Sequence, residues 1–194
     1  MIRIEQKFTL DTRPTEVWTF LTDPFQVAGC LPGAEVTQRL PDGSYAGRFS
    51  VKVGPLTVTY AGKLRFERLD KERLEAELVG QGQDVKGKGG AEMRLTSRLL
   101  PLEGGGTEVV VTSDLGLRGL LAQMGRGVIE SVSTHIFQQF TAAIRQKLAA
   151  SPRGTPVAPA AVPPLSAASL ACVSVARGFG RVWRRLTGGA PGSG

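Results

Sequence analysis

The chain has 194 residues, with 24 basic and 17 acidic side chains, one histidine and a net charge of +7. Residues 1–150 carry 19 of the basic and all 17 acidic side chains, whereas residues 151–194 carry five arginines and no acid. A nucleic-acid-binding domain needs a basic face on a folded element with stacking aromatic side chains, so the nearly neutral body excludes nucleic acid as the expected partner. The two cysteines, Cys30 and Cys172, lie in different segments and do not indicate a disulfide framework.

The first part of the chain predicts one strand and two short helices. Residues 1–10 alternate apolar and polar side chains, which is typical of a strand and not of an apolar signal sequence. We therefore expect the chain to stay in the cytosol. Pro14 opens a short helix, because a proline in the first helical turn lacks only an N–H group that has no partner there. Asp23-Pro24 opens a second helix, and residues 30–34 form a turn.

Six further strands follow, each with alternating apolar and polar side chains. We expect them at residues 35–40, 44–53, 56–69, 73–83, 85–99 and 107–115. Short turns join them, for example Pro41-Asp42-Gly43 and Gly54-Pro55. Because short connections favour antiparallel neighbours, the pattern predicts a meander within a seven-stranded antiparallel sheet.

The long segment 117–149 changes its apolar period from two to near four, which predicts a helix about 45 Å long. Its apolar stripe contains Leu121, Met124, Val128, Val132, Ile136, Phe140, Ile144 and Leu148. Such a stripe has to be buried, and the concave face of the sheet is the one large apolar surface available. We therefore predict an α+β domain over residues 1–150, in which the sheet wraps around a long C-terminal helix.

Glycines on the inner face of the predicted sheet permit two interpretations. They are Gly47, Gly62, Gly80, Gly87 and Gly89. Glycine inside a strand marks a bend or the close approach of another group, so these residues either let the sheet curve or leave room for an apolar cavity, and both can be true. A cavity of this kind would bind a lipophilic small molecule, because alternation places only two polar side chains, Tyr45 and Tyr60, on the otherwise apolar inner face. Its expected lining residues are Phe49, Tyr60, Gly62, Phe66, Gly87, Met93, Leu121, Met124 and Val128.

The segment after the long helix is basic and has three predicted parts. Residues 151–168 are rich in proline and alanine and predict a semi-rigid tether, residues 169–187 predict a basic amphipathic helix, and residues 188–194 predict a disordered end. The expected membrane-binding residues of the helix are Val175, Arg177, Phe179, Arg181, Val182, Trp183, Arg184, Arg185 and Leu186.

This predicted helix suits the surface of an anionic membrane, because its apolar stripe and its arginines lie on different sides. Four prolines between residues 154 and 176 argue against a helix that spans the membrane. The alternatives are that residues 169–187 pack on the body as one more helix, or that they do not fold in solution.

No catalytic or metal-binding pattern is visible in the sequence. The single histidine, His135, cannot by itself support a histidine-based metal site, and Cys30 has no neighbouring base that would make it a nucleophile. The glycines of residues 80–90 do not lie between a strand and an opening helix, as a phosphate-binding loop requires. We therefore expect neither catalytic residues nor a metal, and an enzyme here would have to work mainly through the shape of its cavity.

The order of elements resembles the helix-grip fold of the START-like superfamily, and several short motifs resemble the CoxG family, which is associated with carbon monoxide dehydrogenase. The motifs are Asp23-Pro24, Cys30-Leu31-Pro32-Gly33-Ala34-Glu35, Val51-Lys52-Val53-Gly54-Pro55, Tyr60-Ala61-Gly62 and the glycine-rich residues 87–91. The resemblance covers residues 1–149. A proline-rich tether with a basic, apolar end is also similar to members of this family.

The resemblance implies a non-catalytic accessory protein. Such proteins accompany cytosolic molybdenum hydroxylases of the carbon monoxide dehydrogenase and xanthine oxidase type and bring the enzyme to the inner face of the cell membrane, where its electrons enter the quinone pool. A quinone held without a covalent bond is the ligand that the resemblance implies. The alternatives are a START-like lipid-binding or lipid-transfer protein unrelated to a hydroxylase, and a START-like cyclase or hydrolase.

Overall fold

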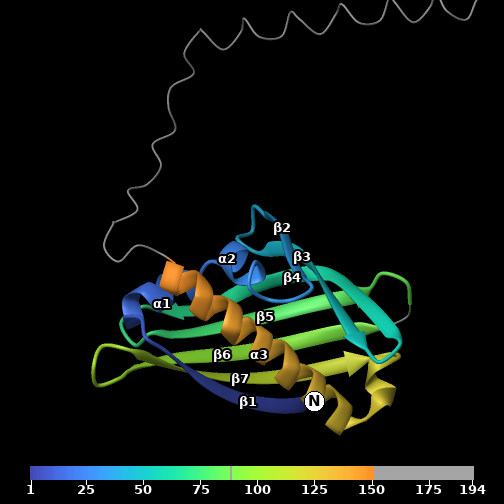
Figure 1. Cartoon of the computed structure of the whole chain (residues 1–194). Helices are drawn as coiled ribbons and strands as arrows, with labels where there is room; N and C mark the ends of the chain where they lie inside the picture. Colours follow the sequence, from blue (N-terminus) through green and yellow to red (C-terminus); the bar gives the residue numbers. More distant parts are fainter. Residues whose placement is uncertain (88, 151–194) are drawn as a thin grey trace, which may run out of the picture. The chain divides into compact units, whose positions relative to one another are not determined.

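A seven-stranded antiparallel sheet wraps around one long helix in the computed structural model, which describes residues 1–87 and 89–150 (Figure 1). The strands are β1 (Ile2–Leu10), β2 (Ala34–Arg39), β3 (Tyr45–Val53), β4 (Leu56–Asp70), β5 (Glu75–Asp84), β6 (Gly90–Pro101) and β7 (Thr107–Arg118). Their order across the sheet is β1-β7-β6-β5-β4-β3-β2, so β2 to β7 form a meander and β1 pairs with β7 at the edge. The predicted α+β fold is confirmed. The parts predicted for residues 151–194 lie outside the described residues.

Two short helices and one short 3₁₀ turn accompany the long helix. They are α1 (Pro14–Leu21), α2 (Pro24–Ala28) and η1 (Leu121–Met124), and the long helix is α3 (Arg126–Ala150). Pro14 and Pro24 each stand in a first turn, as expected. The Asp23 carboxylate accepts hydrogen bonds from the backbone N–H groups of Phe25 and Gln26, which satisfies donors that have no partner within the helix.

The long helix begins at Arg126, whereas the sequence predicted that it begins at residue 117. Strand β7 continues through Leu117, which pairs with Ala91 of β6. Gly119 and Gly125 then have φ angles of 83° and 79°, in the left-handed region where a right-handed helix cannot continue. The helical spacing of residues 121 and 124 in the sequence therefore belongs to η1, which is separate from α3.

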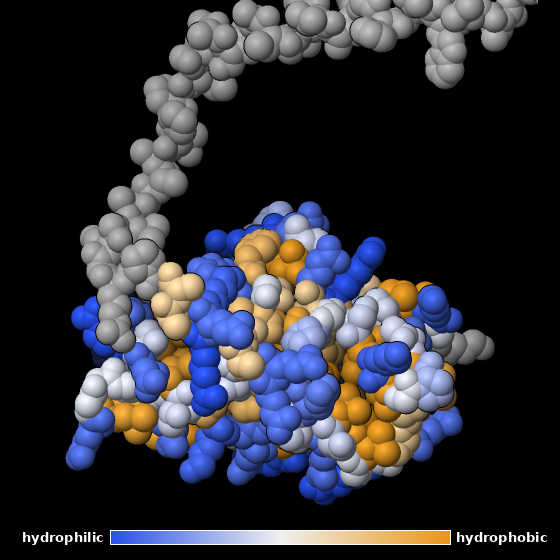
Figure 2. All heavy atoms as spheres, in the orientation of Figure 1, coloured by the Kyte–Doolittle hydropathy of each residue, from blue (hydrophilic) through white to orange (hydrophobic). Residues whose placement is uncertain are grey.

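The first turn of α3 buries a different face from the predicted stripe. Ile129 is 6% exposed, whereas Val128 is 42% exposed. On a helix with 3.6 residues per turn, residues that are four apart differ in direction by about 40°. A line of side chains at every fourth position therefore winds around the helix. It is buried at Phe140 and Ile144 but faces away from the core by residue 128. Figure 2 shows apolar side chains at the surface at the end of the molecule where η1 and the start of α3 lie.

The strands predicted at residues 73–83 and 85–99 have different bounds in the structure. Residues 85–87 and 89 belong to neither strand, and the Asp84 carboxylate accepts a hydrogen bond from the backbone N–H of Lys86 at 3.0 Å. This side-chain turn is typical of aspartate and ends β5. At the other end, Leu74 has a φ angle of 54°, which excludes it from the strand that begins at Glu75.

The buried side chains form two clusters along α3. The first cluster contains Phe140 and Ile144 of α3, which pack with Val17 and Trp18 of α1 and with residues of β1, β6 and β7. The second cluster lies at the start of α3 and contains Val51, Val53, Val58, Tyr60, Leu121 and Ile129. The β3–β4 hairpin therefore folds over η1 and the start of α3, while α1 covers the other end of the helix.

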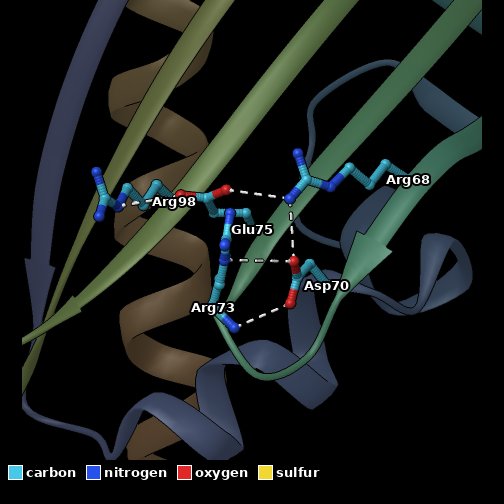
Figure 3. A network of polar contacts seen from close by, with 5 residues as sticks. All are labelled: Arg68, Asp70, Arg73, Glu75 and Arg98. Atoms are coloured by element: carbon cyan, nitrogen blue, oxygen red, sulfur yellow. Dashed lines mark hydrogen bonds and ion pairs between the residues drawn. The ribbon is translucent and has the colours of Figure 1, made fainter.

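The convex face of the sheet carries a network of ion pairs (Figure 3). Arg68 donates to the Asp70 carboxylate at 3.0 Å, and Arg98 lies 3.3 Å from Glu75. The pKa of Asp70 lies below its usual value, first because its carboxylate accepts the backbone N–H of Arg73 and then because of the Arg68 guanidinium. This outer face is charged and solvent-exposed, so the apolar site has to be sought on the concave face.

Candidate ligand-binding cavity

A cavity of about 490 Å³ lies between α3 and the concave face of the sheet. Inward-facing residues of β1 and β3 to β7 form its floor, and Val132, Ile136 and Phe140 of α3 form its roof. Trp18 of α1 and Leu31 after α2 also line it. Small-molecule sites occupy about 300–1,000 Å³ and are lined mainly by apolar side chains, so the size and the lining both suit a lipophilic ligand.

The structure brings six of the nine predicted lining residues to this cavity. They are Phe49, Tyr60, Gly62, Phe66, Met93 and Leu121. The other three, Gly87, Met124 and Val128, do not line it. Placement at the cavity does not by itself test ligand binding, so the binding role of the six residues stays a prediction.

Each of the three exceptions has a local reason. Gly87 belongs to the β5–β6 loop, where a Cβ atom would lie 2.5 Å from the Asp84 carboxylate. Met124 packs against the second core cluster, beside Leu121. Val128 lies on the exposed side of the first turn of α3. Sequence spacing alone suggested the inner face for all three, because it does not show where a strand or a helix begins.

Three glycines stand next to one another across the sheet, where β3, β4 and β5 approach closely. Gly62 of β4 pairs with Gly47 of β3 and with Gly82 of β5. A Cβ atom on Gly62 would overlap the Gln81 carbonyl oxygen, and one on Gly47 would overlap the Glu35 carbonyl oxygen. These positions favour the interpretation that glycine lets the sheet curve.

Gly80 favours the cavity interpretation. The nearest atom to a Cβ at this position is the Met93 methyl carbon at 3.6 Å, which is an ordinary contact. Gly80 also lines the cavity. The missing side chain therefore leaves open space without being required by the backbone. The two interpretations of the glycines apply to different residues.

The inner face is more polar than the sequence suggested. Alternation put only Tyr45 and Tyr60 among the inward polar side chains, but Gln6, Ser97 and Ser113 also line the cavity. Gln6 donates a hydrogen bond to the Thr134 hydroxyl of α3 at 3.4 Å. The signal was present, because these residues have the same parity as their apolar neighbours along β1, β6 and β7.

Tyr45, which was also expected on the inner face, does not line the cavity. Its ring packs edge-on against Phe25 of α2, with the ring centroids 6.0 Å apart. The Arg39 guanidinium lies 5.8 Å from the centre of the Tyr45 ring. Tyr45 therefore joins α2 to the edge of the sheet.

Tyr60 is the buried polar side chain of the cavity. It is 7% exposed, and no residue in the described part of the chain makes a hydrogen bond with its hydroxyl. Burial raises the pKa of the phenol, and the negative charge of Asp84 raises it further. The hydroxyl therefore stays protonated over the neutral pH range.

The described residues contain no cluster of three or more His, Cys, Asp or Glu side chains that could hold a metal ion. His135 is exposed on α3 and lies 2.7 Å from the side-chain nitrogen of Gln139. Cys30 is buried as a free thiol in the first core cluster. Over residues 1–87 and 89–150, no helix is both long enough and apolar enough to cross a membrane.

A sheet that grips a long C-terminal helix over an apolar cavity defines a START-like, helix-grip protein. Several solved structures share this fold. A conserved protein from Geobacillus kaustophilus has a TM-score of 0.69 at 18% identity, covering 76% of this chain and 95% of that one. The Zhui aromatase/cyclase from Streptomyces sp. R1128 has a TM-score of 0.54 at 18% identity, covering 75% and 92%. A START superfamily protein from Mycobacterium smegmatis has a TM-score of 0.52 at 11% identity, covering 77% and 98%.

The chain belongs to the CoxG family, the family of the carbon monoxide dehydrogenase G subunit, whose model matches residues 7–149. The match covers nearly the whole of the described part of the chain. No curated protein is similar enough to this chain to count as a match. The solved structures named above are 18% identical or less, so they show the fold and not the activity.

Substitution of the glycines tests their two roles. We expect Gly62→Ala to lower the free energy of unfolding by about 1–3 kcal/mol, because its methyl group would overlap the Gln81 carbonyl and lie 2.6 Å from the Gly82 Cα. Gly80→Ala is the matched control and should change stability by less than about 1 kcal/mol. Urea unfolding followed by circular dichroism measures both variants. Equal stability of the two would contradict a close approach of strands at Gly62.

Proposed function

We propose that this chain is a non-catalytic accessory protein that binds a lipophilic ligand, a quinone, and links a molybdenum hydroxylase of the carbon monoxide dehydrogenase type to the cytoplasmic face of the cell membrane. The observation that carries the proposal is the apolar cavity of about 490 Å³ under α3, in a chain of the CoxG family. The ligand, the partner enzyme and the membrane are three separate parts of the proposal, and each has its own support and its own test.

The support for the ligand is the combination of volume and chemistry in the cavity. Aromatic and aliphatic side chains, such as Phe49, Phe66 and Phe140, surround a space large enough for a substituted ring. Gly80 adds room where another residue would fill it. A flat, apolar ring system with few polar atoms matches this lining, and a quinone head group is such a system.

The ligand part of the proposal predicts that filling the cavity prevents binding. Gly80→Phe directs a ring into the cavity, so we expect its affinity for 2-methyl-1,4-naphthoquinone to fall by roughly tenfold or more, equal to about 1.4 kcal/mol or more. Leu69→Phe is the control, because Leu69 is 51% exposed at the end of β4. Organic extraction with mass spectrometry and titration of the full-length protein measure bound and added ligand. A wild-type protein that neither carries nor binds a lipophile would contradict the proposal.

A START-like cyclase or hydrolase is the alternative class, and the inward side chains of Gln6, Ser97 and Ser113 are what favours it. An enzyme would convert its cavity ligand, whereas a carrier releases the ligand unchanged. The same mass spectrometry therefore separates the two classes when the ligand is analysed before and after incubation. Conversion of the ligand would contradict a non-catalytic role.

The partner enzyme follows from family membership, because the CoxG family takes its name from carbon monoxide dehydrogenase. We expect the full-length protein to co-purify with a hydroxylase whose large, medium and small subunits are encoded beside it. The control is the same purification with an unrelated molybdenum hydroxylase. Failure to co-purify with any neighbouring hydroxylase would overturn this part of the proposal and leave the ligand part intact.

The membrane part of the proposal depends on residues 169–187, which lie outside the described residues. Four arginines, Arg177, Arg181, Arg184 and Arg185, contribute on the order of 1 kcal/mol each at an anionic surface of low ionic strength. The apolar residues Phe179, Val182, Trp183 and Leu186 add to this by partial burial. Neither contribution alone anchors the protein firmly, so we propose reversible, peripheral binding at the cytoplasmic face.

Liposome co-sedimentation tests the membrane part. Full-length protein should bind anionic vesicles more than neutral ones, and a chain ending at Ala150 should bind neither. Replacing Phe179 and Trp183 by Ser should reduce binding more at high salt, whereas replacing the arginines should reduce it more at low salt, because salt screens charges and not apolar contacts. Equal binding by the full-length and the shortened chain would be the contrary result.

A further inference from the structure

Tyr60 has a hydroxyl group whose hydrogen-bonding capacity is unused in the structure. The side chain lines the cavity and is 7% exposed. Among the described residues, every fully buried side-chain oxygen and nitrogen has a hydrogen-bond partner, yet none of these residues bonds to the Tyr60 hydroxyl. The hydroxyl is therefore not enclosed by protein atoms and retains contact with open space. Because the side chain lines the cavity, that space is available to a ligand.

The surroundings of Tyr60 are apolar on the inner face of the sheet. It belongs to the second core cluster, together with Val51, Val58 and Leu121. Along the sheet it pairs with Phe49 of β3 and Asp84 of β5. A polar group among apolar side chains helps to fix the orientation of a ligand, because a polar ligand atom is favoured next to it.

The hydroxyl is suited to donate. A phenol is both a donor and an acceptor, and here its raised pKa keeps the proton in place. The neighbouring Asp84 carboxylate accepts a hydrogen bond from the backbone N–H of Lys86 and makes none with the Tyr60 hydroxyl. An oxygen that accepts a hydrogen bond is therefore the complementary ligand atom. A hydrocarbon of the same shape would leave the hydroxyl without a partner, which is unfavourable for a buried group.

We propose that the Tyr60 hydroxyl donates a hydrogen bond to a carbonyl oxygen of the cavity ligand and selects carbonyl-bearing lipophiles over hydrocarbons of the same shape. This inference rests on the proposed function, because it assumes a lipophilic ligand in the cavity. It adds a specificity-determining residue and the ligand atom that this residue contacts. No covalent step is involved.

Ser113, another polar side chain of the cavity, lies at a different level of the sheet from Tyr60. Ser113 of β7 pairs with Leu95 of β6, Leu95 pairs with Leu78 of β5, and Leu78 pairs with Phe66 of β4. Phe66 is six residues from Tyr60 along β4, a separation of about 20 Å at 3.3 Å per residue. The Ser113 hydroxyl is therefore not next to a ligand carbonyl that is bound at Tyr60.

Equilibrium dialysis of the full-length protein with two probes tests the inference. The probes are 2-methyl-1,4-naphthoquinone and 2-methylnaphthalene, which share a ring system and differ in the carbonyl groups. We expect Tyr60→Phe to weaken binding of the quinone about tenfold, equal to about 1.4 kcal/mol, and to leave binding of the hydrocarbon unchanged. Tyr45→Phe is the matched control, because it removes the same phenol hydroxyl from a residue that does not line the cavity, and it should bind both probes like the wild type.

Several results would overturn the inference. Unchanged quinone affinity in Tyr60→Phe shows that the hydroxyl does not contact the ligand, and equal losses for both probes show a packing role only. A selective loss of quinone binding in Tyr45→Phe as well shows that the effect does not come from a hydroxyl inside the cavity. In each of these cases the wild type still binds lipophiles, so the proposed function stands. A wild type that binds neither probe overturns the proposed function together with this inference.

Discussion

The close approach of strand backbones at Gly47 and Gly62 is the constraint on which the rest of the structure depends. Side chains at these two positions would force β3 away from β2 and β4 away from β5. Without them the sheet curves, and the β3–β4 hairpin reaches over the sheet to contact Leu121 and Ile129. A flatter sheet would cover α3 only along its middle strands and would leave the start of the helix without a partner.

The cavity is a product of this arrangement. The two core clusters hold α3 near its two ends, one through Phe140 and Ile144 and the other through Ile129. The side chains between the clusters do not fill the space between α3 and the sheet. Gly80, on the floor of the cavity, adds to this open space because it has no side chain. The protein keeps this space because the helix is fixed at both ends and cannot collapse onto the sheet. Residues of both core clusters, such as Phe140 and Tyr60, therefore also line the cavity.

Strand positions could be predicted from the sequence because alternation and turn residues are local signals, and the antiparallel meander follows from short connections. The start of α3 could not be predicted from the sequence, because composition does not reveal the left-handed backbone angles of Gly119 and Gly125. Val128 was misplaced for another reason, because residues four apart turn by about 40° per step and the stripe has left the core in the first turn of α3. Gln6, Ser97 and Ser113 were overlooked although their parity was correct, because apolar neighbours dominated the interpretation.

The ion pairs of the convex face affect how the protein responds to its ionic environment. Arg68, Arg94 and Arg98 bond to carboxylates of neighbouring residues at solvent-exposed positions, where each pair contributes little to folding. Dissolved salt weakens such pairs without removing any large share of the stability, which comes from the buried clusters. The body therefore tolerates ionic strengths that dissociate charged surfaces from one another. Folding and the proposed membrane binding therefore respond to different solution conditions, and salt that weakens the proposed binding would leave the body folded.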